Sequence, residues 1–380
     1  MEGVDPVLAA AEVAPIPTVA EGAPVPAPTP VSTTAPRGRH AGIELGRAFA
    51  MLAVVLVHVP PPAPAASWLR PLAELGVPYF FVVSGYFLGV SRGVGAPAQQ
   101  GLPAVRGMLR KLLGLYLLGC VVYALVPLDW LSPLRHGELL AACRATLSES
   151  VLAFRAAPVA RLLDGPPGGF HLWFLPALAC GAGLLALTVR LGQERVLLAL
   201  AVALFVLGLL GGRYADTPLG LALGVNTRNG PFQSTLLVGL GYALSIRGLP
   251  LRAPRRGPLV LGFGLLMLWL ESAWLRAQLG VLPDDYSVAV LPLGLGAFLC
   301  FHDLPRMPAR VERACLALGG STLGVYLWHV LLRVPVASVL GALGLYPRDG
   351  APPVWGFVAL FVVSAALVLM AQRLGGACRR

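Results

Sequence analysis

Ten long apolar segments dominate this chain from Ile43 onward. Each holds close to the 20 or so residues that a helix needs to cross about 30 Å of hydrocarbon. Only 12% of the residues are charged, against about 25% in soluble domains, which leaves too little polar surface to coat a globule in water. We therefore predict an all-α, polytopic transmembrane bundle of about ten helices, at roughly 43–60, 71–90, 109–128, 170–189, 196–212, 231–247, 258–275, 286–302, 315–335 and 354–372.

Two stretches lack this pattern. Residues 1–40 are rich in Ala and Pro, and their repeated prolines forbid a helix, so we predict a disordered cytoplasmic tail ahead of a transmembrane domain at 41–376. A loop at about 129–169 separates the third and fourth apolar segments and is expected on the outer side. Within it, Leu139–Phe154 has the apolar spacing of a helix that could lie along the membrane interface.

The distribution of basic residues predicts the orientation. With the N-terminus in the cytoplasm, most of the 29 basic residues fall on cytoplasmic loops, and an even number of helices returns the C-terminus to the same side. This rule also explains the net charge of +11. We expect contact with membrane lipid and none with nucleic acid, because no compact basic patch with interleaved aromatic residues occurs.

The first segment carries three ionisable residues, Glu44, Arg47 and His58. Such residues cost at least about 2.5–3.5 kcal/mol in a transmembrane helix, so they are functional candidates. At 100° per residue, Arg47 and His58 lie about 20° apart around the helix, and Glu44 lies about 40° from His58. His58 stands just before Val59 and three prolines, where the helix must break.

Each of these residues also has a simpler interpretation. Glu44 and Arg47 are spaced to form an ordinary i,i+3 pair near the membrane boundary. A lone membrane histidine is more often structural than catalytic, although a neutral imidazole is the usual general base for activating a hydroxyl. His329, in the middle of the ninth segment, is interpreted as a satisfied core histidine.

Six motifs occur in a specific order along residues 43–335. They are Glu44-Leu-Gly-Arg47 followed by His58, Pro78-Tyr79-Phe80-Phe81 followed by Ser84-Gly85-Tyr86, the basic group Arg106, Arg110 and Lys111, Phe170-His171-Leu172-Trp173-Phe174-Leu175, Thr227-Arg228-Asn229-Gly230, and Ser321 followed by Tyr326-Leu327-Trp328-His329. In this order they resemble the motifs of a membrane acyltransferase family, acyltransferase 3. The resemblance is strongest to the subgroup that acetylates surface or shared polysaccharides.

The resemblance implies an enzyme of the bacterial inner membrane with both termini cytoplasmic. It would transfer an acyl group, commonly acetyl, from acyl-CoA as co-substrate to a hydroxyl of a cell-envelope polysaccharide or lipid-linked sugar. His58 would be the general base or an acyl relay. Arg47 would stabilise negative charge in the transition state or hold the donor's phosphate, and Glu44 would orient Arg47.

The remaining candidates concern binding. Arg106, Arg110 and Lys111 are either contacts to coenzyme A phosphates or ordinary cytoplasmic anchors, and Arg228, His171 and Trp173 are candidates for binding the acceptor. No permanently bound cofactor is expected. No metal site is predicted either, since the six cysteines stand singly and the sequence lacks an HExxH motif.

Two other classes of function share some of these sequence features. A transporter or flippase of an envelope glycan precursor also fits ten helices with intramembrane charges, but the sequence lacks the matched pair of interrupted helices expected of one. A degenerate relative serving as scaffold or sensor is disfavoured by the intact Glu44, Arg47 and His58. Ser84-Gly85 is interpreted as a point of close helix approach.

Overall fold

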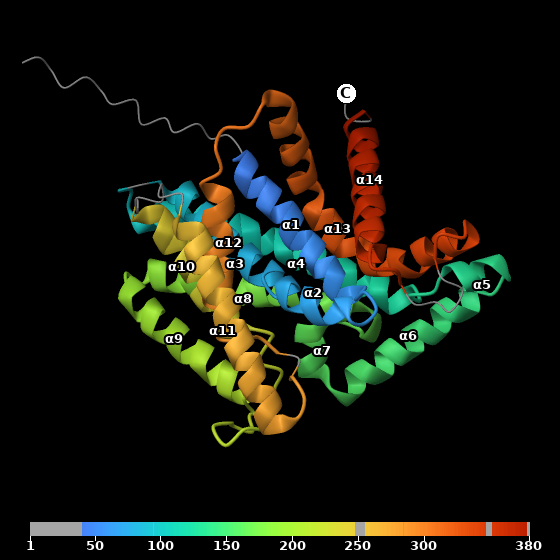
Figure 1. Cartoon of the computed structure of the whole chain (residues 1–380), viewed down its shortest axis with the longest axis horizontal. Coiled ribbons are helices and arrows are strands. Elements are labelled where there is room, and N and C mark those ends of the chain that lie inside the picture. Colours follow the sequence, from blue (N-terminus) through green and yellow to red (C-terminus); the bar gives the residue numbers. More distant parts are fainter. Residues whose placement is uncertain (1–39, 94, 248–254, 284, 347–351, 378–380) are drawn as a thin grey trace, which may run out of the picture. The chain divides into compact units, whose positions relative to one another are not determined.

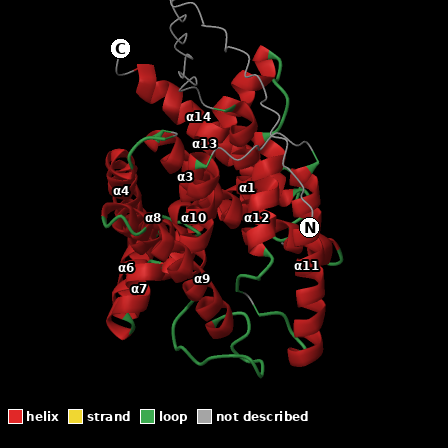
Figure 2. Ribbon diagram, turned by 90° about the vertical axis from the view of Figure 1, so that its left-hand side faces the viewer, coloured by secondary structure: helices red, strands yellow, loops and turns green. Residues whose placement is uncertain are grey.

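The computed structural model describes residues 40–377, except residues 94, 248–254, 284 and 347–351. Within those residues all regular structure is helical and no strand occurs (Figures 1 and 2). The prediction of an all-α, polytopic helical bundle is confirmed. The predicted disordered tail lies outside the described residues, apart from His40.

Each predicted apolar segment coincides with one main helix. The ten helices are α1 (Ala41–His58), α3 (Gly76–Arg92), α4 (Leu102–Leu125), α8 (Phe174–Arg190), α9 (Glu194–Gly211), α10 (Pro231–Ile246), α11 (Arg256–Leu279), α12 (Val290–His302), α13 (Ala309–Ala342) and α14 (Gly356–Ala377). Short 3-10 turns, η1 (Ala98–Gly101) and η2 (Pro167–Trp173), lead into α4 and α8. Among the described residues, seven helices are long and apolar enough to cross a membrane: α1, α4, α8, α9, α11, α13 and α14, with α4 and α8 counted together with their leading turns.

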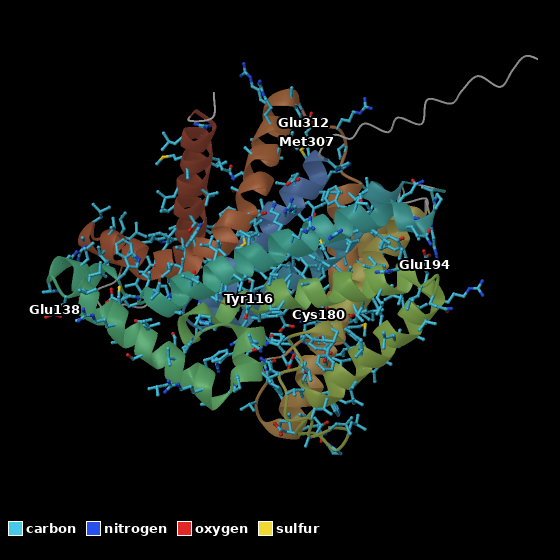
Figure 3. The ribbon with its side chains drawn as sticks, turned by 180° about the vertical axis from the view of Figure 1, so that it is seen from behind. Tyr116, Glu138, Cys180, Glu194, Met307 and Glu312 are labelled. Carbon is cyan, nitrogen blue, oxygen red and sulfur yellow. The ribbon has the colours of Figure 1, made fainter. Side chains whose placement is uncertain are left out.

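The shorter helices fill the connections. After the prolines that end α1, α2 (Ala65–Ala73) leads to α3. The stretch at 129–169 contains α5 (Leu131–Arg135), α6 (Leu139–Ala156) and α7 (Pro158–Asp164), so the helix predicted at 139–154 is present as α6. The Tyr116 hydroxyl of α4, labelled in Figure 3, donates to the Leu162 carbonyl at 2.8 Å and holds α7 against α4.

Glycine residues allow close contacts between neighbouring helices, both between α3 and α10 and between α13 and α1. A Cβ atom on Gly85 of α3 would collide with the backbone of α10, as the Ser84-Gly85 motif predicted. A Cβ on Gly319 of α13 would collide with the side chain and backbone of Glu44 in α1. The Tyr79 hydroxyl of α3 also donates to the Ile43 carbonyl of α1 at 2.9 Å. Helix α1, which carries the predicted site residues, is thus packed directly on α3 and α13.

Candidate active site

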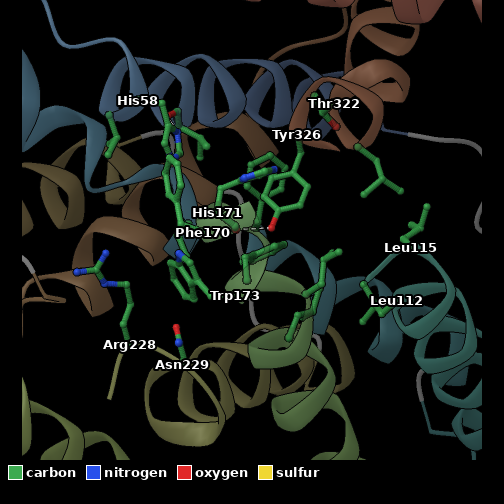
Figure 4. Close-up of a pocket in the computed structure, with 18 of the residues that line it drawn as sticks. His58, Leu112, Leu115, Phe170, His171, Trp173, Arg228, Asn229, Thr322 and Tyr326 are labelled. Atoms are coloured by element: carbon green, nitrogen blue, oxygen red, sulfur yellow. Dashed lines mark hydrogen bonds between the residues drawn. The ribbon is translucent and has the colours of Figure 1, made fainter. Parts of the chain in front are cut away.

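A cavity of about 700 Å³ opens among α1, α3, α4, α7, α8, α13 and the loop before α10 (Figure 4). This volume lies within the roughly 300–1,000 Å³ of typical ligand sites. Five basic side chains reach its wall, and the described lining residues include a single acid, Asp164; the basic residues are Arg47, Arg70, Lys111, Arg161 and Arg228. Such a positive excess favours an anionic ligand.

His58 stands in the cavity wall at the last residue of α1, where the prolines were predicted to end the helix. Its Nδ1 atom lies 2.8 Å from the Val54 carbonyl oxygen. A carbonyl oxygen can only accept, so the neutral ring carries its proton on Nδ1 and its lone pair on Nε2. This tautomer gives His58 a basic nitrogen.

His329 of α13 contacts the Nδ1 side of the His58 ring. It is fully buried, and its Nε2 lies 3.2 Å from Nδ1 of His58. Its own Nδ1 lies 2.9 Å from the Tyr326 carbonyl oxygen and 3.1 Å from that of Val325, so that nitrogen is the donor and Nε2 the acceptor. His329 is therefore placed to stabilise an imidazolium at His58. The interpretation of His329 as only a satisfied core residue accounts for Nδ1 and misses the contact of Nε2.

His171 completes a cluster of three histidines. It lies in η2 with 2% of its surface exposed, and its ring centroid is 6.2 Å from that of His58 and 5.3 Å from that of His329. The rings of Tyr123 and Tyr326 enclose it at 4.8 Å and 5.5 Å. The structure thus places this predicted acceptor-binding residue directly beside the predicted base.

Arg47 and Glu44 form the i,i+3 ion pair that the sequence allowed. The Nη1 atom of Arg47 lies 3.3 Å from the Glu44 carboxylate. Glu44 is 1% exposed and packs on Gly319, while Arg47 keeps 28% of its side chain exposed and lines the cavity. Glu44 is absent from the lining residues and acts on the cavity through Arg47.

The predicted donor-binding trio is divided. Lys111 lines the cavity, whereas Arg106 and Arg110 are exposed side chains of α4 that do not belong to its wall. Helical geometry accounts for the separation, because Arg106 and Arg110 lie about 40° apart around the axis and Lys111 lies about 100° beyond Arg110.

The other two predicted acceptor residues, Arg228 and Trp173, lie at a second polar part of the cavity. Figure 4 shows Arg228 and Asn229 beyond Trp173 as seen from His58. The Arg228 guanidinium carbon lies 5.9 Å from the centre of the Trp173 ring, which is a cation–π distance. The Asn229 amide donates to Asp164 of α7. Burial raises the pKa of Asp164, and nearby Arg161 and Arg228 oppose that rise.

Sequence reasoning missed Asp164 and Arg161 as parts of this site. Both belong to the stretch at 129–169, which was predicted as an outer loop, yet α7 brings them to the cavity wall. A seven-residue helix is too short to give a clear periodic signal.

Comparisons with known proteins identify relatives of the whole helical region. A family model described as an acyltransferase domain matches residues 40–373. The chain is 28% identical over 254 residues to a serine/alanine racemase of Enterococcus gallinarum, covering 63% of this chain and 34% of that protein. It is 27% identical over 315 residues to an amino-acid racemase of Enterococcus faecalis, covering 78% of this chain and 42% of that protein. The chain thus spans about a third to two fifths of the length of these relatives, and no solved structure matches it.

Proposed function

The chain belongs to acyltransferase family 3, and on that premise we propose that it transfers an acyl group, most often acetyl, from acyl-CoA to a hydroxyl of a cell-envelope polysaccharide or lipid-linked sugar. One observation carries the proposal. Nδ1 of His58 contacts both the Val54 carbonyl oxygen and Nε2 of His329, and the ring stands in the wall of a cationic cavity of about 700 Å³.

The reaction needs one base that takes the proton of the acceptor hydroxyl and then gives it to the leaving thiolate. The acceptor oxygen attacks the thioester carbonyl carbon while Nε2 of His58 takes the hydroxyl proton. The carbon–sulfur bond then breaks, and the coenzyme A thiolate leaves with the proton from His58. His329 stabilises the charged imidazole between these steps through the contact at Nδ1. In a relay, the same lone pair would carry the acyl group instead.

The basic residues support an anionic donor. Arg47 presents a guanidinium, which binds phosphate as a fork and keeps its charge, and Glu44 holds that group in place. Lys111 adds a second positive charge in the wall. We propose these two residues as contacts to the phosphates of acyl-CoA, which enters from the cytoplasmic side of a bacterial inner membrane. The names of the two relatives describe those racemases.

The aromatic and amide groups support a sugar acceptor. Trp173 offers an apolar face on which a sugar ring can pack, and Arg228, Asn229 and Asp164 offer donors and acceptors beside it. A hydroxyl of a sugar bound there would point toward the histidine cluster, because Trp173 lies between Arg228 and His58 in the cavity (Figure 4).

Label transfer in membranes tests the proposal. Membranes containing the full chain would be incubated with radiolabelled acetyl-CoA and total envelope glycan. We expect label in the glycan with the natural chain and with His136→Ala, which replaces an exposed histidine directly after α5, and none with His58→Ala. Full transfer by His58→Ala would overturn the assignment. Movement of a glycan precursor across vesicles without any label transfer would favour the transporter or flippase.

The donor contact can be tested separately, because Lys111 is the single lysine of the chain. An amine-reactive reagent would be applied with and without acetyl-CoA, and modification of Lys111 would be measured by peptide mass spectrometry. We expect acetyl-CoA to slow this modification and acetate to leave it unchanged. Equal rates in all three samples would contradict the placement of the donor at Lys111.

A further inference from the structure

The ring of His171 is a polar group buried inside the helical bundle. It lines the cavity with 2% of its surface exposed. Neither of its ring nitrogens makes a hydrogen bond within 3.5 Å to the residues that the structure describes. A buried polar group left in this state costs free energy, and such groups are often completed by a ligand.

The hydroxyl groups around His171 are already engaged. The Tyr326 hydroxyl donates to the His171 backbone carbonyl at 2.6 Å, and the Tyr123 hydroxyl donates to the Leu327 carbonyl at 2.8 Å. The Thr322 hydroxyl, also in the wall, donates to the Gly319 carbonyl at 2.8 Å. The imidazole N–H of His171, which exists in either neutral tautomer, is a donor in this part of the wall that makes no hydrogen bond within 3.5 Å to the residues that the structure describes.

His171 and His58 lie close enough together to act on one acyl group, His58 as the base and His171 as a hydrogen-bond donor. Their ring centroids are 6.2 Å apart and the rings stand at 79° to each other. Both rings line the same cavity, so a carbonyl group lying beside them there can receive attack next to His58 while its oxygen points to His171. A site within about 3 Å of both a base and an oxyanion donor is what acyl transfer requires.

We propose that His171 is a catalytic residue that donates a hydrogen bond to the carbonyl oxygen of the acyl group. This inference rests on the proposed acyl transfer and replaces acceptor binding as the role of His171. When the acceptor oxygen attacks, the carbonyl π electrons move to that oxygen and the His171 N–H stabilises the negative charge. When the carbon–sulfur bond breaks, those electrons return to the carbonyl. The hydroxyl proton passes to His58 and then to the thiolate, so His171 keeps its own proton throughout.

The carbonyl stretching band of bound acetyl-CoA tests this contact without catalysis. The full-length His58→Gln protein, in which transfer is blocked, would be loaded with [1-¹³C]acetyl-CoA and with the unlabelled compound, and their infrared difference spectrum recorded. We expect the thioester band to shift to lower frequency than in free acetyl-CoA. Adding His171→Phe, which keeps an aromatic ring between Tyr123 and Tyr326, should abolish the shift, whereas adding His136→Phe should preserve it.

Kinetics in the His58-containing protein provide a second measurement. We expect His171→Phe to lower kcat roughly a hundredfold or more, with a smaller change in KM for acetyl-CoA. His171→Gln, whose amide can still donate, should retain part of both the band shift and the rate. Should the Phe variant fail to fold, His171→Leu serves as the second variant without a donor.

The outcomes separate this inference from the proposed function. If the carbonyl band of bound acetyl-CoA has the same position with and without the His171→Phe substitution, the proposed role of His171 is wrong. The proposed acyl transfer is not affected by that result. A rise in KM for the glycan with no band change would return His171 to acceptor binding. Failure of the His58→Gln protein to bind acetyl-CoA at all would overturn both proposals.

Discussion

Replacing His329 by phenylalanine would show whether His58 and His329 act as a unit. Phenylalanine keeps a ring in a fully buried position and removes the Nε2 atom that lies 3.2 Å from Nδ1 of His58. The Val54 carbonyl oxygen, 2.8 Å from the same nitrogen, remains as an acceptor. His58 therefore keeps its tautomer in the variant, and only the support of its charged form is lost.

The size of the effect follows from the change in this hydrogen bond during the reaction. With neutral His58 the bond is worth about 0.5–1.5 kcal/mol, and with a charged donor about 1.5–3 kcal/mol. Only the difference, about 1–1.5 kcal/mol, acts on the rate of the chemical step. We therefore expect kcat to fall roughly 5- to 12-fold. A wrong tautomer costs about 10⁴-fold in serine proteases, so a fall of that size would mean that Val54 does not hold the proton in place.

Initial rates of label transfer from acetyl-CoA would give kcat and KM for His329→Phe, with His136→Phe as the exposed control. Thermal unfolding of both purified variants would establish that the buried substitution leaves the protein folded. A folded His329→Phe protein with unchanged kcat, or with a change confined to KM, would refute the pairing as part of the chemistry.

Two further predictions concern stability. Gly319→Ala should destabilise the purified protein by about 1–3 kcal/mol because the new methyl group would overlap Glu44, whereas Gly341→Ala, in open space on the same helix, should be neutral or stabilising; equal shifts in thermal unfolding would contradict the close contact. Burial raises the pKa of Asp164 above its ordinary value of 3.8, so the native state holds this proton where the unfolded state has lost it, and stability falls as pH rises through that window. Asp164→Asn, which keeps an oxygen that can accept from Asn229, should lack this fall and be the more stable protein at neutral pH; superimposable stability–pH curves would contradict it.

The helices could be predicted because each depends mainly on its own residues. An apolar run of about 20 residues specifies a membrane helix without reference to any other part of the chain. The end of α1 at His58 was equally local, since the prolines at 60–62 cannot continue a helix. Helices α5 and α7 have only five and seven residues, so they give too few turns for their apolar pattern to stand out.

The histidine cluster could not be predicted in the same way. His58 and His329 are 271 positions apart, and their contact depends on how α13 is rotated about its own axis. Packing against other helices sets that rotation. A helix that is apolar on all sides has no amphipathic pattern in its sequence to show which face is buried. The sequence offered one signal, a histidine one turn after Tyr326 in the middle of a membrane helix, and a satisfied core histidine gives the same signal.

The separation of Lys111 from Arg106 and Arg110 was available from the sequence. Neighbouring residues on a helix point about 100° apart, so Arg110 and Lys111 cannot both face one narrow cavity. All three side chains are exposed, but Lys111 lines the cavity, whereas Arg106 and Arg110 do not and are suited to the membrane boundary.

The contacts of α1 with α13 explain how three ionisable residues are accommodated in one membrane helix. Glu44 packs on Gly319, and His58 meets His329 farther along the same pair of helices. These contacts lie about 21 Å apart along α1 and about 15 Å apart along α13, so together they fix both the sliding and the rotation of one helix on the other. A rotation of α13 that relieved the contact at Gly319 would also move His329 away from His58. The ion pair that holds Arg47 and the histidine pair that supports the base therefore depend on a single packing arrangement.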